Sequence, residues 1–391
     1  MTESLRNDVT AEVTAQVTTI LAELIAIDSV YPPGDTQAIM AYTAKRLAAA
    51  GYRVQTLTQQ APIANVVARL GAGSPAIVFN VHADTVGISD RSAWRTDPMV
   101  ASEQAGRVYG LGAGNCKAAM AAQIWAAEAI ARRCQPLRGE VIFTFVGDEE
   151  SLGPNGLAYL RASGAVKPDI LIVGAQTENQ LVIAERGVLW VRLITRGRAA
   201  HAGATRSGDN AILRMMRVIN AIETHLAPII AQRRDGSLQS MINIGKILGG
   251  ANTNVVPDFC EAMIDRRLLP TERVDAAFAE LCRQVLGIGE PNGTVEIERI
   301  TGTNGFRAPA DGRGVAAFGA AIQSVTGQPA RFLDVVGVFD GRYFADEGIE
   351  IIDFGPGEGN EGHAPNESVP LRQVAAAALI QRDVVAELTR A

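Results

Sequence analysis

The chain has 391 residues, of which 47% are hydrophobic and 20% are charged, and its formal net charge is −6. This composition is typical of a globular protein large enough for two domains. The acidic balance and the scattered basic residues argue against a nucleic-acid partner. The N-terminus is polar, and no stretch approaches the roughly 18 apolar residues that span a bilayer. We therefore expect a cytoplasmic protein with no membrane contact.

The four cysteines, Cys116, Cys134, Cys260 and Cys282, have no C-x-x-C spacing. In a chain of this length such scattered cysteines favour free thiols in a reducing compartment over a disulfide framework. Cys116 is expected to be a buried free thiol.

The N-terminal part alternates between predicted strands and helices. Apolar positions at helical spacing predict helices over 9–27 and 36–50, the second ending at Gly51. Further along come strands over 52–57, 63–70, 76–82, 141–146 and 170–173, and an Ala-rich helix over 117–133. This alternation predicts an α/β fold with a mostly parallel sheet.

The pattern changes near Gly187. Strands are predicted over 188–195, 239–248, 258–266 and 294–300, with helices over 208–226 and 272–286. The α/β pattern returns with helices over 312–325, 339–347 and 370–388 and a strand over 349–354. The sequence therefore predicts a compact α+β unit inserted into the α/β domain.

The apolar strand over 76–82 ends in His-x-Asp, formed by His82 and Asp84. Residues two apart on a strand point to the same face. An imidazole beside a carboxylate at the C-terminal end of a parallel strand is typical of a metal ligand and its orienting partner. A hydrogen-bonded structural histidine is the alternative, but the chain has four histidines and two others lie in loop motifs.

Three further motifs accompany the His-x-Asp. A Gly-rich turn over 109–117 leads into a helix and contains Asn115 and Lys117, whose side chain at a helix start can simply be solvated. The acidic segment Asp148-Glu149-Glu150 follows a buried strand, where three carboxylates are costly unless a cation offsets them. The last motif, over 362–367, contains His363 between glycine and proline residues.

Together and in this order, these motifs resemble the co-catalytic zinc aminoacylase and carboxypeptidase family, which includes acetylornithine deacetylase and succinyl-diaminopimelate desuccinylase. The resemblance extends over nearly the whole chain. It implies a catalytic domain over 1–186 and 302–391 with the metal at the C-terminal edge of its parallel sheet. It also implies an inserted dimerisation or lid domain over 187–301, through which a homodimer forms.

Carried over by position, the resemblance implies roles for the residues of the α/β domain. His82 is a metal ligand, and Asp84 holds its other ring nitrogen. Glu149 is the general base that takes a proton from the metal-bound water. Glu150 and His363 bind the second metal position.

The same resemblance implies roles for residues of the inserted unit. His201 reaches into the site of the partner subunit and stabilises the oxyanion. Asn254 and Arg267 contact the substrate, often its carboxylate. A structural ion pair with Asp265, two residues away on the same strand, is the alternative for Arg267.

Two positions depart from the family pattern. Asn115 stands where a bridging carboxylate is expected, and Ala175 stands where an acidic ligand is expected. The charge balance then predicts a single divalent ion, held by some of His82, Asn115, Glu150 and His363. Mixed imidazole, carboxylate and amide ligation suits Mn, Zn, Co or Fe(II).

These residues favour a hydrolase that cleaves a C–N bond of a small carboxylate-bearing substrate, such as an N-acyl amino acid or a dipeptide-like amide. Two alternatives stay open. One is an aminohydrolase that displaces the amino group of an activated aromatic amine such as a nitroanthranilate, where a second metal is dispensable. The other is an inactive binding homologue, since lost ligand positions are also what such a protein would have.

Overall fold

The computed structural model describes residues 3–133, 136–333, 335, 337–359 and 361–390, and Cys134 lies outside them. The chain divides into two compact units. Unit 1 comprises Met1–Ile183, Ala308–Val335 and Phe339–Ala391, and unit 2 comprises Ala184–Arg307 and Val336–Val338. Unit 2 is therefore an insertion in the sequence of unit 1.

A six-stranded sheet forms the centre of unit 1, in the order β2-β3-β8-β4-β9-β20. Strands β8, β4, β9 and β20 run parallel to one another, whereas β3 is antiparallel to both β8 and β2. The bounds are β2 (Arg53–Leu57), β3 (Asn65–Ala72), β4 (Ala76–His82), β8 (Gly139–Val146), β9 (Ile170–Val173) and β20 (Glu350–Asp353). The predicted α/β class with a mostly parallel sheet is confirmed.

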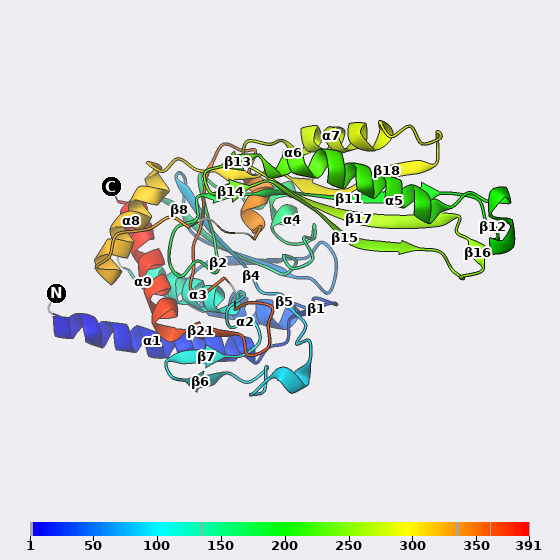
Figure 1. Ribbon diagram of the computed structural model, residues 1–391. Helices are drawn as coiled ribbons and strands as arrows, with labels where there is room; N and C mark the ends of the chain where they lie inside the picture. The colour runs from blue at the N-terminus through cyan, green and yellow to red at the C-terminus, as the bar shows by residue number, and fades with distance from the viewer. Residues whose placement is uncertain (1–2, 134–135, 334, 336, 360, 391) are drawn as a thin grey trace. The chain divides into compact units, whose positions relative to one another are not determined.

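Helices cover the sheet of unit 1 because its central strands are apolar on both faces. Almost every residue of β4 and β8 is buried, and the rings of Phe79 and Phe143 stack with centroids 4.9 Å apart. Helices α1, α3 and α9 pack against one another, as Figure 1 shows. The helices are α1 (Glu3–Ile25), α2 (Gln37–Ala49), α3 (Lys117–Ala131), α4 (Leu157–Ala162), α8 (Arg313–Thr326) and α9 (Leu371–Leu388).

The register of the parallel strands brings their C-terminal ends to one edge of the sheet. His82, the last residue of β4, pairs with Val146, the last residue of β8. The N–H of Gly174, just after β9, donates to the carbonyl of Asn80. Loops that are far apart in the sequence therefore begin side by side at this edge, where ligand sites of open α/β sheets lie.

Short strands complete unit 1. They form a two-stranded sheet and a three-stranded sheet of order β21-β7-β6. Their bounds are β1 (Val30–Tyr31) with β5 (Thr85–Val86), and β6 (Ser102–Gln104), β7 (Arg107–Tyr109) and β21 (Ser368–Pro370).

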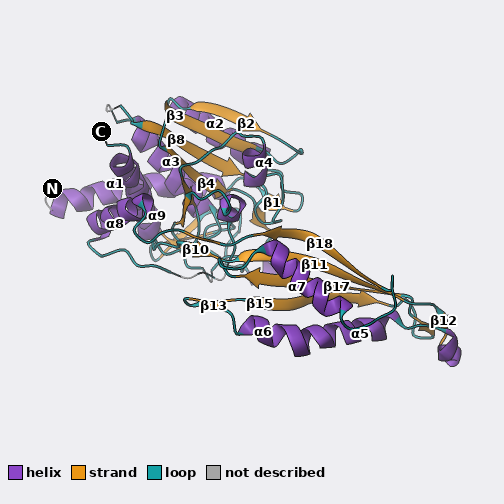
Figure 2. Ribbon diagram, turned by 90° about the horizontal axis from the view of Figure 1, so that it is seen from above, coloured by secondary structure: helices purple, strands orange, loops and turns teal. Residues whose placement is uncertain are grey.

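Unit 2 contains an antiparallel four-stranded sheet of order β15-β17-β11-β18. Burial alternates along β17, so one face of the sheet is packed. Helices α5 and α7 contact this sheet and each other (Figure 2). The main elements are β11 (Gly187–Arg196), α5 (Ala211–Ala221), α6 (Ala227–Ala231), β15 (Met241–Gly249), β17 (Phe259–Leu268), α7 (Val274–Leu286) and β18 (Val295–Thr303).

Smaller strand pairs also belong to unit 2. They are β10 (Ala184–Glu185) with β19 (Phe306–Arg307), β12 (Ala200–His201) with β16 (Val255–Val256), and β13 (Arg234–Asp235) with β14 (Leu238–Gln239).

Two predicted helices differ from the structure in helix type as well as in bounds. The helix expected over 208–226 begins at Ala211, because the Asn210 side chain caps it by accepting the N–H of Leu213, and a π-helical segment, Ile222–Leu226, connects it to α6. The helix expected over 339–347 is only the 3₁₀ turn Asp340–Phe344. Its polar residues Asp340 and Arg342 are buried, which the apolar spacing did not indicate.

No helix among the described residues has both the length and the apolar character needed to cross a membrane. Cys116, Cys260 and Cys282 are free, and Cys116 is buried as predicted.

Candidate metal centre

His82 lies at the end of β4 and is 4% exposed. Its Nδ1 lies 3.0 Å from the backbone oxygen of Asp84 and 3.5 Å from Asp84 Oδ1. Asp84 therefore fixes the ring and leaves Nε2 to face the centre of the site. Burial alone would lower the pKa of His82, but Asp84, Cys116 and the charge of Glu149 together raise it well above its usual range.

The Asp84 carboxylate also holds the acidic loop that follows β8. It accepts the backbone N–H groups of Glu149 and Glu150, each at 3.0 Å from Oδ2. Asp148 serves the loop itself, because its carboxylate accepts both the backbone N–H and the side-chain amide of Asn155 at 2.8 Å. The three consecutive carboxylates thus separate into one structural group and two that remain for the site.

Asn115 is carried by the Gly-rich turn, which a buried carboxylate holds in place. Glu367 accepts the N–H groups of Gly112, Gly114 and Asn115 at 2.9, 2.9 and 2.5 Å. Burial raises the pKa of Glu367 to about 7, although these three N–H groups act in the opposite direction. The sequence motif contained Glu367 but carried no sign of this anchoring role.

His363 enters the site from the loop after β20. Its φ is +64°, an uncommon backbone conformation for a residue other than glycine. Its Nε2 lies 3.0 Å from Glu150 Oε1 and 2.8 Å from Asn115 Nδ2. The chain therefore brings together all four residues that the sequence nominated as metal ligands.

The spacing of these side chains fits a divalent cation. The ligand atoms of His82, Glu149 and Glu150 lie within 4.8 Å of one another, in a search of the described residues only. His82 Nε2 is 3.3 Å from Asn115 Oδ1 and 3.9 Å from Glu149 Oε2. Two ligand atoms that share an ion at about 2.0–2.2 Å are no more than about 4.4 Å apart, so both distances are compatible with a shared ion.

The residues at the two altered family positions offer fewer metal-ligand atoms than the expected carboxylates. Ala175 follows β9 and is buried but has no donor atom. Its neighbour Gln176, which sequence reasoning missed, extends beside the Gly-rich turn, where a Cβ on Gly114 would lie 3.1 Å from its Nε2. That nitrogen is buried and has no hydrogen-bond partner among the described residues. Glu178 lies close to Ala175 in the sequence, but it is exposed and does not belong to the group formed by His82, Glu149 and Glu150.

Nothing in the sequence indicated the buried ion pairs that Arg342 makes with Glu149 and Asp340. Arg342 Nη1 lies 3.6 Å from Glu149 Oε1, and its Nη2 lies 3.8 Å from Asp340 Oδ1. Asp340 in turn accepts the side-chain amide of Asn80 at 3.1 Å. Burial raises the pKa of Glu149 to about 7, with Asp340 acting in the same direction and His82 and Arg342 opposing it.

Lys117, at the start of α3, is fully buried, so the interpretation of a solvated lysine is wrong. Its Nζ donates to the carbonyl of Ile27 at 2.9 Å. Burial lowers the pKa of Lys117 to about 8, against the attraction of Asp28 and Glu367. The packing of α3 against other segments, which local sequence does not specify, decides this.

The nominated residues of unit 2 lie in two places. His201 is exposed, its Nδ1 accepts the N–H of Gly203, and its strand β12 pairs with β16 next to Asn254. Arg267 makes a bidentate ion pair with Asp265, at 2.8 and 2.9 Å. The ion pair with Asp265, which is the structural alternative to substrate binding by Arg267, is thus present in the fold.

A mostly parallel α/β sheet with a histidine and two carboxylates at its C-terminal edge defines a metallohydrolase-like class of protein. Residues 78–387 match the model of peptidase family M20/M25/M40. Since this match covers most of the sequence, the chain belongs to that family of hydrolases, as the sequence motifs predicted.

Relatives in the family align with this chain along most of their length. Succinyl-diaminopimelate desuccinylase of Xanthobacter autotrophicus is 28% identical, over 94% of this chain and 98% of its own. N-acetyl-L-citrulline deacetylase of Xanthomonas campestris is 30% identical, over 77% and 79% of the two chains. The M20 metallo-carboxypeptidase Sso-CP2 of Sulfolobus solfataricus shares the fold, with a TM-score of 0.79, 17% identity and coverage of 96% and 99%.

Proposed function

We propose that this chain is a metal-dependent hydrolase that cleaves the C–N bond of a small carboxylate-bearing substrate, an N-acyl amino acid or a dipeptide-like amide. The observation that carries the proposal is the position of Glu149, whose carboxylate lies 3.9 Å from His82 Nε2 and 3.6 Å from the buried Arg342. The named activities of the desuccinylase and deacetylase relatives support an N-acyl substrate.

A divalent cation held by some of His82, Asn115, Glu150 and His363 would supply Lewis-acid activation of a water molecule and of the scissile carbonyl. Mn, Zn, Co and Fe(II) all suit such donors. The remaining work belongs to the chain. Glu149 accepts the proton of the attacking water and returns it to the leaving nitrogen.

The groups around Glu149 suit a base with a pKa near neutrality. Arg342 stabilises the ionised carboxylate by its charge, whereas burial destabilises it. Asp84 holds the backbone of residue 149, so the carboxylate stays aimed at the centre of the site. A base whose pKa lies near the working pH is deprotonated in a large fraction of molecules and is still basic enough to accept a proton.

For unit 2 we propose the roles of a lid and a dimer interface. Its edge strand β15 exposes about half of the side chains of Met241, Ile247 and Leu248, which favours pairing with a second copy. His201 of one copy would then stabilise the oxyanion in the site of the other. Asn254 and Arg267 would bind the substrate carboxylate, for which Arg267 must exchange its partner Asp265.

A Glu149→Gln variant tests the central step. Wild type and variant are assayed on N-acyl amino acids and dipeptides with added Mn²⁺, Co²⁺ or Zn²⁺. We expect the rate of the variant to fall by about 10²- to 10⁴-fold. Glu140→Gln, at the opposite end of β8, is the matched control and should leave the rate unchanged.

The same assay separates the alternatives. Ammonia release from an activated aromatic amine, with no turnover of amides, would show that the chain is an aminohydrolase and not an amide hydrolase. Absence of turnover of every substrate by wild type would favour an inactive homologue. An unchanged rate for Glu149→Gln would remove Glu149 from the role of base.

A further inference from the structure

The side-chain amide of Asn115 has different neighbours on its two sides. Its Nδ2 lies 2.7 Å from Glu150 Oε1 and 2.8 Å from His363 Nε2. These two partners are themselves 3.0 Å apart. On the other side, Asn115 Oδ1 lies 3.3 Å from His82 Nε2. One neutral amide therefore separates a Glu150–His363 side from a His82 side.

Hydrogen-bond chemistry fixes which way this amide points. An ionised carboxylate only accepts hydrogen bonds, so the amide atom 2.7 Å from Glu150 Oε1 must be the nitrogen. The reverse orientation would put two acceptor oxygens in contact, which is unfavourable. The second N–H of the amide is on the side of His363, whose Nε2 lies 2.8 Å from Asn115 Nδ2.

The other side of Asn115 gathers atoms that can bind a cation. His82 Nδ1 lies 3.0 Å from the backbone oxygen of Asp84, and its Nε2 lies 3.3 Å from Asn115 Oδ1. Glu149 Oε2 lies 3.9 Å from the same nitrogen. An imidazole nitrogen, an amide oxygen and a carboxylate oxygen that lie this close together are ligand atoms that one divalent cation can share.

We propose that the N–H₂ group of Asn115 takes the place of one of the two cations typical of the family pattern. The chain then binds one divalent ion on the His82 side, whereas Glu150 and His363 are held on the other side by hydrogen bonds. This inference rests on the proposed function for the presence of a metal, and it adds the side on which the metal binds. A neutral donor is consistent with a cluster in which Asn115 and Ala175 have replaced two carboxylates.

Mn²⁺ binding to the metal-free full chain tests this inference without any substrate. Calorimetry and metal analysis give the number of ions per chain and their affinity. Wild type should bind a single Mn²⁺. Asn115→Asp keeps the shape but places a carboxylate against Glu150, where a cation relieves the repulsion, so this variant should bind a second Mn²⁺.

Two histidine variants form a matched pair. His82→Gln should weaken Mn²⁺ binding by about 100-fold, whereas His363→Gln should change the Kd by less than about threefold. Thermal unfolding of the metal-free proteins controls for folding. If Asn115→Asp does not fold, the histidine pair decides the outcome.

Two bound ions in wild type, or one in folded Asn115→Asp, would overturn the inference. So would equal losses of affinity in His82→Gln and His363→Gln, because these would place the ion between both sides. Ion counts need no turnover. A protein that binds ions as expected but hydrolyses no amide would therefore overturn the proposed function and leave this inference standing.

Discussion

The Asp84 carboxylate accepts the backbone N–H of Glu149 at 3.0 Å, although the two residues are 65 positions apart in the chain. The same oxygen, Oδ2, accepts the N–H of Glu150, while the backbone oxygen of Asp84 faces His82 Nδ1. One residue thus orients the histidine and both site carboxylates. The link exists because β4 and β8 are parallel neighbours that end together.

Asp84→Asn should therefore impair both metal binding and turnover. The amide keeps one acceptor oxygen but loses the charge, and its N–H₂ group can face the N–H groups of the loop unfavourably. We expect Mn²⁺ affinity to fall by about 10- to 100-fold, as for other partners that orient metal ligands. Calorimetry measures this change.

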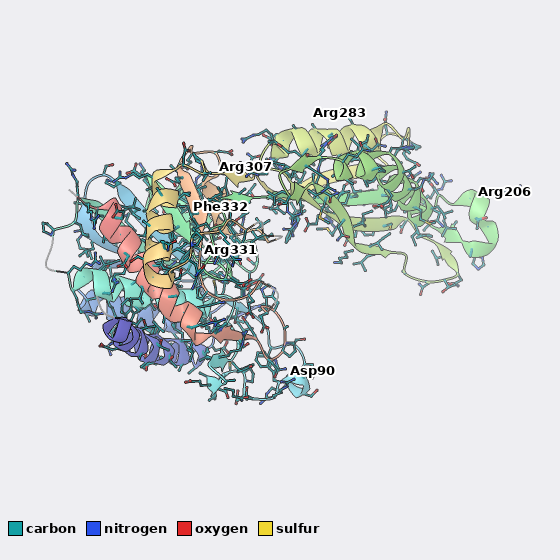
Figure 3. The ribbon with its side chains drawn as sticks, turned by 60° about the vertical axis from the view of Figure 1, so that its left-hand side comes forward. Asp90, Arg206, Arg283, Arg307, Arg331 and Phe332 are labelled. Carbon is teal, nitrogen blue, oxygen red and sulfur yellow. The ribbon has the colours of Figure 1, made fainter. Side chains whose placement is uncertain are left out.

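The exposed Asp90, labelled in Figure 3, provides the control. Asp90→Asn should leave Mn²⁺ affinity and rate unchanged. Wild-type affinity in Asp84→Asn would contradict the orienting role of its carboxylate.

Arg342→Lys should lower kcat with little effect on KM or on Mn²⁺ affinity. Lysine keeps the charge but lacks the planar guanidinium group, whose two Nη atoms donate to Phe339 O at 2.8 Å and to Tyr343 Oη at 2.9 Å. Glu149 then loses its fixed counter-charge, and we expect kcat to fall by about tenfold. Steady-state kinetics give the separate changes in kcat and KM.

Arg331 is an exposed arginine of the same unit, labelled in Figure 3, and Arg331→Lys is the control. If both variants keep the wild-type kcat, Arg342 has no part in positioning Glu149.

Glu367→Gln should destabilise the metal-free fold. Glutamine offers one acceptor oxygen where the carboxylate receives three N–H groups, and its N–H₂ group would face at least one of them. Unsatisfied buried groups of this kind cost about 1–3 kcal/mol each. Urea unfolding followed by circular dichroism gives the difference in the free energy of unfolding.

Glu358→Gln, which changes a partly buried carboxylate that pairs with Arg107, serves as the comparison. It should cost about 1 kcal/mol or less, in line with other partly exposed ion pairs. Equal losses in the two variants would deny Glu367 any special role in holding the turn.

Lys117 should make the stability of the metal-free protein rise with pH. Burial lowers its pKa to about 8 in the fold, whereas the ordinary value is 10.5. Between these values the unfolded chain binds more protons than the folded chain, so the free energy of unfolding increases with pH. From about pH 7 to about pH 9.5 the gain from this group is about 2 kcal/mol.

Lys117→Met removes the titrating group and keeps an unbranched apolar stem. Urea unfolding of both proteins over this pH range should show that the free energy of unfolding of wild type increases relative to that of the variant as the pH rises. A difference independent of pH would mean that Lys117 keeps its ordinary pKa in the fold.

Sequence alone was sufficient for the fold class and for the loops that form the site. Continuous apolar runs, alternating with helical stretches, are local signals. His82 and Glu149 could be placed together because both follow buried parallel strands, whose C-terminal ends meet at one edge of the sheet. The sequence therefore placed the predicted ligands at this edge, and the family resemblance gave them their individual roles.

Only the tertiary structure decided which partner each polar group has. Arg342 reaches Glu149 from nearly two hundred residues away, and Glu367 anchors a turn in another part of the chain. Lys117 is buried because α3 packs against segments remote in sequence, although nothing near it is unusual. Local patterns report the preferences of neighbouring residues. Charge pairs and burial instead depend on distances in space, which are set when distant segments pack together.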